Sequence, residues 1–194
     1  MEYVLTPYSK KMEPFVWWEG AFTETELDTL QAKAQKADAP AQVGNATQKG
    51  ELNENVRRSD LSWVKNDKEF SWVFEKLAQV VSKLNADYFG FDLVGFGEPI
   101  QLTNYGEDKR GMYGWHKDFG GQISRKLSMV LQLSDPADYE GGNLEIMTSG
   151  NPQKMRKQRG LIIVFPSWTL HQVTPVVQGS RQSLVAWVSG SPFK

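Results

Sequence analysis

The chain has 194 residues, 40% of them hydrophobic, and a formal net charge of −1 at pH 7. Such a chain can form one domain with a sizeable core, its composition excludes intrinsic disorder, and its charge gives no overall attraction to nucleic acid or an anionic membrane. Cysteine is absent, which excludes disulfides, thiolate zinc sites and cysteine nucleophiles. No secretory signal or membrane-spanning apolar run is found, so we expect a cytoplasmic protein without a membrane partner.

Two helices are predicted in the N-terminal part of the chain. Thr23 followed by Glu26 has the form of a capping box, and apolar residues at helical spacing come after it. A longer apolar stripe from Phe70 to Leu84 predicts a second helix that ends near Gly90. Stripes of this kind face the core, so we expect both helices to support the rest of the fold.

The segment between the two predicted helices, residues 39–55, is rich in Gly, Asn, Gln and Ala and is predicted to be a loop. Long loops inside compact domains are either lids over a site or simply disordered, so we expect residues 39–55 to be mobile. The sequence VRRSDLSWV that follows predicts a strand, in which Arg57 or Arg58 is placed to pair with Asp60.

From residue 98 onward the sequence consists of short apolar or alternating runs separated by turn residues. This pattern predicts seven or eight strands in an all-β barrel or jelly roll, because no helix-length segments intervene to make a parallel sheet. We therefore expect one α+β domain over residues 1–194, mostly β, in which helical support from residues 1–97 packs on a barrel of residues 98–190.

The stretch YGWHKDFGG contains one of the two histidines of the chain. Residues two apart on a strand point to the same face, so His116 and Asp118 are expected to project side by side. The other histidine, His171, follows the buried run LIIVFPSWT and is expected at the mouth of the next strand. Two imidazoles and one carboxylate compose the facial triad of non-haem Fe(II) oxygenases. A His-x-Asp pair by itself is a weak signal, because many such pairs are structural.

Arg181 comes ten residues after His171, on a mostly apolar predicted strand. It shares a face with Ser183, and a guanidinium inside an apolar barrel needs a partner. That partner is either an internal Asp or Glu, or the carboxylate of a ligand bound in bidentate fashion. Trp187 faces the same interior, either as a wall beside a metal or as an ordinary core residue.

The sequence HKD, the distal LHQVTP and then SRQS resemble the motifs of Fe(II)- and 2-oxoglutarate-dependent dioxygenases, in the prolyl 4-hydroxylase-like branch that includes bacterial PKHD-type hydroxylases. The resemblance extends over about residues 98 to 190 and is loose in the first half of the chain. It implies a double-stranded β-helix of the jelly-roll, cupin-like type, with Fe(II) as the metal and with 2-oxoglutarate and dioxygen as cosubstrates. It also allows for ascorbate as a reductant.

The resemblance further implies a set of site residues. The implied metal ligands are His116, Asp118 and His171, and Arg181 is the implied anchor for the distal carboxylate of 2-oxoglutarate. Residues expected beside that anchor are Ser183, Tyr105 and Gln132, where some relatives carry a tyrosine in place of Gln132. Residues expected to line the substrate pocket are Tyr113, Trp187 and Arg58.

The resemblance also implies the reaction. Halogenating members of the superfamily lack the metal-binding carboxylate, and this chain has Asp118, so hydroxylation of a C–H bond with release of succinate and carbon dioxide is expected. A prolyl residue in a protein or peptide is the expected substrate, and a free amino acid or other small molecule is the alternative. A nucleic-acid demethylase and a non-catalytic cupin-like binding protein are more remote hypotheses, the former because the chain is not basic.

Overall fold

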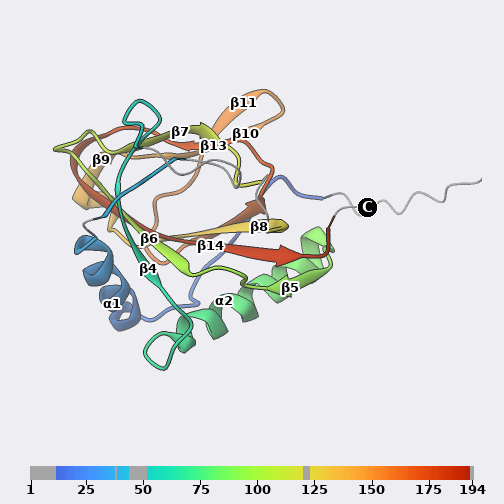
Figure 1. The fold of residues 1–194 in the computed structure, drawn as a ribbon. Helices are drawn as coiled ribbons and strands as arrows, with labels where there is room; N and C mark the ends of the chain where they lie inside the picture. The colour runs from blue at the N-terminus through green and yellow to red at the C-terminus, as the bar shows by residue number, and fades with distance from the viewer. Residues whose placement is uncertain (1–11, 38, 44–51, 120–122, 193–194) are drawn as a thin grey trace, which may run out of the picture.

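The computed structural model of the protein describes residues 12–37, 39–43, 52–119 and 123–192. Two antiparallel sheets lie one above the other in this part of the chain, and two α-helices cover the outer side of the larger sheet (Figure 1). The predicted α+β fold, mostly β and of the double-stranded β-helix type, is confirmed. None of the helices in the described ranges is long and apolar enough to cross a membrane.

The first helix, α1 (Glu24–Gln35), begins where the sequence predicts it. The Thr23 side chain accepts a hydrogen bond from the Glu26 N–H at 3.3 Å, and the Glu26 carboxylate accepts one from the Thr23 N–H at 2.8 Å. This capping box satisfies two N–H groups that the helix itself cannot pair. The buried side of α1 carries Leu27, Leu30 and Ala34, so the predicted stripe faces the core.

The second helix, α2 (Ser71–Leu84), continues into one turn of π-helix, η1 (Asn85–Phe89). The helical segment ends at Gly90, whose φ of 72° lies in the left-handed region that glycine tolerates. The predicted end near Gly90 is therefore confirmed.

The larger sheet, called the major sheet below, has the strand order β1-β12-β8-β14-β6-β4-β2, and β5 and β9 also pair with β14. A short 3-10 turn, η2 (Pro136–Asp138), precedes β9. The strands of the major sheet are β1 (Val16–Trp18), β2 (Ala39–Pro40), β4 (Asp60–Val64), β5 (Leu93–Gly95), β6 (Ile100–Gly106), β8 (Arg125–Gln132), β9 (Tyr139–Gly141), β12 (Ile162–Pro166) and β14 (Val176–Gly190).

The smaller sheet, called the minor sheet, has the strand order β11-β10-β13-β7-β3. In Figure 1 its strands β7, β10 and β13 lie on the opposite side of the major sheet from α1 and α2. The strands of the minor sheet are β3 (Arg57–Arg58), β7 (Met112–His116), β10 (Leu144–Thr148), β11 (Asn151–Lys154) and β13 (His171–Val173).

Two apolar clusters hold these layers together. The larger cluster joins the helices to the outer face of the major sheet and includes Leu30, Leu77 and Leu131. The smaller cluster lies on the inner face, between the sheets, and includes Ile146 and Phe165. Strands β6, β8, β12 and β14 contribute to both clusters, because successive side chains alternate between the faces of a sheet.

The predicted strand VRRSDLSWV is split in the structure. Its first residues form β3 in the minor sheet and its last residues form β4 in the major sheet, with Ser59 between them. The expected pairing of Asp60 with an arginine is wrong, because Asp60 pairs with Lys109 at 2.8 Å. The strand break turns the two arginines toward the minor sheet and leaves Asp60 beside β6.

The loop predicted over residues 39–55 begins with β2, which pairs with β4, so its first residues are strand rather than loop. Residues 44–51 lie outside the described residues, and a lid at this place stays a prediction. The division of the chain near residue 97 also stays a prediction. Strands β1 to β5 all precede that position and join one or the other sheet, so residues 1–97 contribute more than helices.

The sequence predicts separate strands for the apolar runs HQVTPVV and SLVAWVS, but the longest strand, β14, joins the end of the first run to the second. It passes through Gly179 at a φ of 73°, where a Cβ atom would lie 2.0 Å from the carbonyl oxygen of Asp138. Only glycine allows this approach of β14 to the turn before β9. The sequence predicts a turn at Gly179, whereas in the structure Gly179 lies within the continuous strand β14.

Candidate metal centre

His116 and His171 lie directly opposite each other in the minor sheet. His116 is the last residue of β7, His171 is the first residue of β13, and the two are register partners. Their ring centroids are 4.1 Å apart. Strand pairing thus brings together two histidines that are remote in the sequence.

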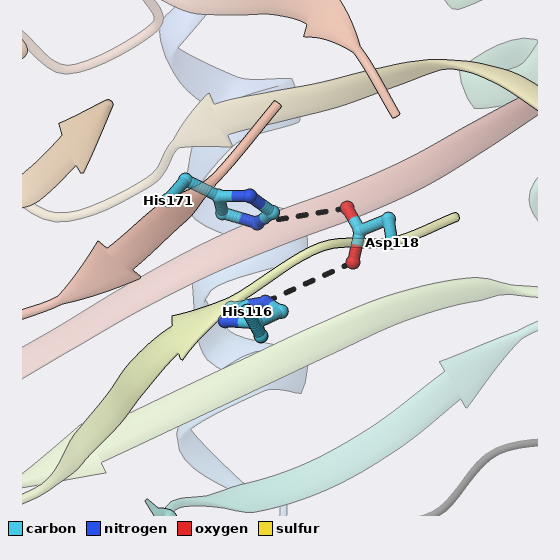
Figure 2. A group of neighbouring side chains, drawn as sticks. All are labelled: His116, Asp118 and His171. Carbon is cyan, nitrogen blue, oxygen red and sulfur yellow. Dashed lines mark ion pairs between the residues drawn. The ribbon is translucent and has the colours of Figure 1, made fainter. Parts of the chain in front are cut away.

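Asp118 completes the group from outside the strand. The predicted strand carrying both His116 and Asp118 is wrong in this detail, since β7 ends at His116. The chain is held there by the Asp118 N–H, which donates to the Ser167 carbonyl at 2.9 Å. Figure 2 shows the carboxylate beside the two imidazoles, with one oxygen facing each ring. One oxygen is 3.8 Å from Nε2 of His116 and the other is 3.6 Å from Nε2 of His171. One ligand atom from each residue lies within 4.8 Å of the others.

Backbone carbonyls orient both imidazole rings. Nδ1 of His116 is 2.8 Å from the Gly114 carbonyl oxygen, and Nδ1 of His171 is 2.9 Å from that of Thr169. A carbonyl oxygen only accepts, so each ring carries a proton on Nδ1, and its Nε2 faces Asp118. Metal-binding histidines are commonly held by such a contact to the second nitrogen.

The charge state of the three groups suits a divalent metal. Burial, followed by repulsion from His171, lowers the pKa of His116 to about 4, so its ring is neutral at pH 7. Burial by itself raises the pKa of Asp118, but the two imidazoles and a hydrogen bond from Ser128 at 2.7 Å outweigh it and keep the pKa below its ordinary value. Two neutral nitrogen donors and one carboxylate are the donor set of non-haem Fe(II).

Arg181 lies on β14 and is only 1% exposed. Its Nη2 donates to Oε1 of Gln132 at 2.9 Å and its Nη1 to Oγ of Ser183 at 3.3 Å, while the centroid of the Tyr105 ring is 5.4 Å from the guanidinium carbon. Among the described residues no carboxylate pairs with Arg181, and its Nε is buried without a hydrogen-bond partner. A carboxylate ligand would supply the missing acceptor.

A single cavity connects the three metal-ligand candidates with Arg181. Four other site residues named from the sequence also line it: Tyr105, Tyr113, Ser183 and Trp187. Gln132 does not line the cavity and reaches it only through Arg181. The cavity is therefore lined both by a group of metal-ligand candidates and by a buried guanidinium.

The expected substrate-pocket residues occupy different positions. The Tyr113 ring stacks on His116 with centroids 3.5 Å apart, and Trp187 is beside Asp118 with its Nε1 buried and without a hydrogen bond of good geometry. Arg58 lies outside the cavity and donates to the carbonyl oxygens of Glu54 and Arg110.

Sequence reasoning missed two residues at this centre. Arg57, and not Arg58, lines the cavity, and Ser128 holds the Asp118 carboxylate. Ser128 stands between Leu127 and Met129 in β8, so its side chain points to the opposite face of the strand from those two apolar residues. This alternation in the sequence could have indicated that Ser128 faces the barrel interior. No local signal distinguishes the two arginines, because the pairing of β3 with β7 decides which one turns inward.

Comparison with known proteins agrees with this geometry. Residues 100–189 match the family model of the 2OG-Fe(II) oxygenase superfamily. A PKHD-type hydroxylase of Sphingopyxis alaskensis is 36% identical over 111 residues, which are 54% of this chain and 50% of that relative. The chain thus matches about half the length of this curated relative.

Two solved structures are similar in fold. A Pseudomonas putida prolyl-4-hydroxylase superposes with a TM-score of 0.70 at 22% identity, over 91% of this chain and 92% of that one. A Trichoplax adhaerens prolyl hydroxylase in complex with a hypoxia inducible factor peptide fragment superposes with a TM-score of 0.75 at 14% identity, over 91% and 84%. The segment that forms the double-stranded β-helix, residues 100–189, carries all three metal-ligand candidates and Arg181, and it is this segment that is similar to the 2OG-Fe(II) oxygenase superfamily.

Proposed function

We propose that the protein is an Fe(II)- and 2-oxoglutarate-dependent dioxygenase that hydroxylates a C–H bond and releases succinate and carbon dioxide. One observation carries the proposal. Two imidazoles and a carboxylate converge in the wall of a cavity that is also lined by a buried arginine whose Nε has no partner. The first group suits iron and the second suits a carboxylate.

The residues divide the work as follows. His116, Asp118 and His171 hold the iron, and Arg181 binds the distal carboxylate of 2-oxoglutarate. Gln132 and Ser183 orient the guanidinium, and Tyr105 covers it. When bound, iron and 2-oxoglutarate activate dioxygen for oxidation of a substrate C–H bond.

The walls of the cavity protect and place the substrate. Trp187 and Tyr113 border the metal ligands with aromatic rings, which exclude water and leave an apolar surface for a C–H group. A prolyl residue in a protein or peptide is the substrate that we propose first, because the relatives in fold are prolyl hydroxylases and one is bound to a peptide. A free amino acid is the second candidate.

The experiment is an incubation of the protein with Fe(II), 2-oxoglutarate, ascorbate and a panel of proline-containing peptides and free amino acids. We expect succinate to form together with a product that has gained one oxygen atom, detected by mass spectrometry. Arg181→Ala should lose both, and Arg58→Ala, which changes an arginine outside the cavity, should keep both. Succinate formation that does not depend on Arg181 would contradict the proposed site, and oxidation of free amino acids alone would exclude the peptide.

A further inference from the structure

Arg57 is a second buried arginine in the wall of the same cavity. It is the first residue of β3, is 7% exposed, and lines the cavity together with the metal-ligand candidates. Its guanidinium carbon lies 4.4 Å from the centroid of the Tyr113 ring, and that ring stacks on His116. The positive charge of Arg57 is therefore separated from a metal ligand by only one aromatic ring.

The hydrogen bonds of Arg57 leave part of its guanidinium unpaired. Nε donates to Oγ of Ser59 at 2.9 Å, but Nη2 is buried and has no hydrogen-bond partner. In the part of the chain that the structure describes, Arg57 forms no ion pair. Its neighbour Arg58, by contrast, donates to two backbone carbonyls. A buried and unpaired cationic N–H is costly, and a bound acceptor would remove that cost.

A count of charges identifies the kind of acceptor. Apart from the two histidines, which would ligate the metal, the ionisable acidic and basic lining residues are Arg57, Asp118 and Arg181. In the loaded site the two charges of iron would balance those of 2-oxoglutarate, and Arg181 would balance Asp118. The charge of Arg57 would remain without a counterpart, so the loaded cavity favours an anionic substrate over a neutral one.

We propose that Arg57 binds a carboxylate of the substrate, so that the substrate is an acid whose carboxylate lies close to the hydroxylated carbon. This inference rests on the proposed oxygenase function and narrows its substrate class. An acidic residue beside the target in a peptide and a free carboxylic acid share this chemistry. Arginine binds either carboxylate strongly because its N–H groups match the two oxygens.

The test measures binding to protein loaded with Zn(II), which does no redox chemistry, and with 2-oxoglutarate, which occupies Arg181. The probes are two matched pairs: N-acetyl-proline against N-acetyl-prolinamide, and a proline-containing peptide with a neighbouring Glu against the same peptide with Gln. Calorimetry should show that at least one acid binds about tenfold more tightly than its amide. The pair that shows the preference distinguishes the small acid from the peptide.

Three variants assign the preference to Arg57. In Arg57→Met the acid and the amide should bind equally, and in Arg57→Lys the preference should be reduced, because the charge remains without the two-pronged geometry. Arg58→Met is the matched control and should keep the wild-type preference. An equal affinity for acids and amides in the wild-type protein, or a preference that persists in Arg57→Met, would overturn the proposal.

A stability measurement separates this role from a structural one. We expect the melting temperature of metal-free Arg57→Met to equal or exceed that of the wild type, because an uncompensated buried charge is removed. A lower melting temperature with an unchanged acid preference would make Arg57 a structural residue instead. The two proposals also fail separately: if 2-oxoglutarate does not raise the melting temperature of the zinc-loaded wild type, the oxygenase is contradicted, whereas stabilisation with equal affinities contradicts only the role of Arg57.

Discussion

The two faces of the major sheet differ in chemistry although the same strands build both. On the outer face, β8 and β14 present Leu131 and Leu184 to the helices. On the inner face, one residue along, they present Gln132 and Ser183, which both accept hydrogen bonds from Arg181 in the cavity wall. Because side chains alternate along a strand, neighbouring residues face opposite sides of the sheet. One of them packs in the core, and the next contributes to the cavity.

The cavity on the inner side of the major sheet also contains unpaired polar atoms. Arg57 Nη2, Arg181 Nε and Trp187 Nε1 are all buried without a partner, and all three residues line the cavity. Buried polar groups in folded proteins are normally paired, so a cluster of exceptions indicates where a ligand is accommodated. The outer face stabilises the protein, and the inner face gives up some stability for binding.

The largest effect on activity is expected for Asp118→Ala, which changes a residue that lines the cavity. Loss of the only acidic metal ligand should reduce succinate formation by about a thousandfold or more. The melting temperature of the metal-free protein should change little, because a buried charge disappears together with its hydrogen bond. Succinate assays and calorimetry check both parts. A loss of stability as large as that of a core variant would break the distinction between the faces.

Leu131→Ala, at the outer face, is expected to have the opposite effect: stability should fall and metal binding should be retained. Removal of this fully buried side chain should lower the free energy of unfolding by about 2–5 kcal/mol, through lost burial and a cavity. Zinc affinity of the folded protein should stay close to that of the wild type. Denaturant unfolding and metal titration measure the two quantities. Val130→Ala, the neighbouring change on the cavity side, should cost less stability and serves as the matched control.

The free energy of unfolding of the metal-free protein should depend on pH, because His116 is buried at the cavity with a lowered pKa. The pKa of His116 is about 4 in the folded chain and 6.5 for an ordinary imidazole, so between these values the unfolded chain binds more protons. Stability should therefore be complete above about pH 6.5 and should decrease by roughly 3 kcal/mol as the pH falls to about 4. Denaturant unfolding across this range tests the sign. His116→Gln should show a correspondingly weaker decrease.

A smaller effect is expected for Ser128→Ala. The hydroxyl of Ser128 holds one oxygen of Asp118, and loss of such a contact commonly weakens metal binding by about tenfold or more. Ser62→Ala on β4 is the control, because the Ser62 hydroxyl is buried without a partner and is not among the residues that line the cavity. Equal metal affinities of Ser128→Ala and the wild type would show that backbone contacts alone orient the carboxylate.

Local patterns in the sequence were sufficient for much of the fold. The capping box at Thr23 and the apolar stripe that ends at Gly90 predicted both helices, because caps and helical periodicity act over a few residues. The motif around His116, with His171 and Arg181 at their spacing, predicted the metal centre and its carboxylate anchor as candidates. These residue types carry their chemistry wherever the chain places them.

Tertiary structure decided the rest. Whether Arg57 or Arg58 enters the cavity depends on the pairing of β3 with β7, and the union of two predicted strands into β14 depends on the close approach at Gly179. The approach of Asp118 to both imidazoles depends on a hydrogen bond to Ser167, nearly fifty residues away in the chain. By itself the sequence determined which chemical groups are present and which local elements form. Contacts between distant strands, which no local pattern encodes, determined which of those groups meet.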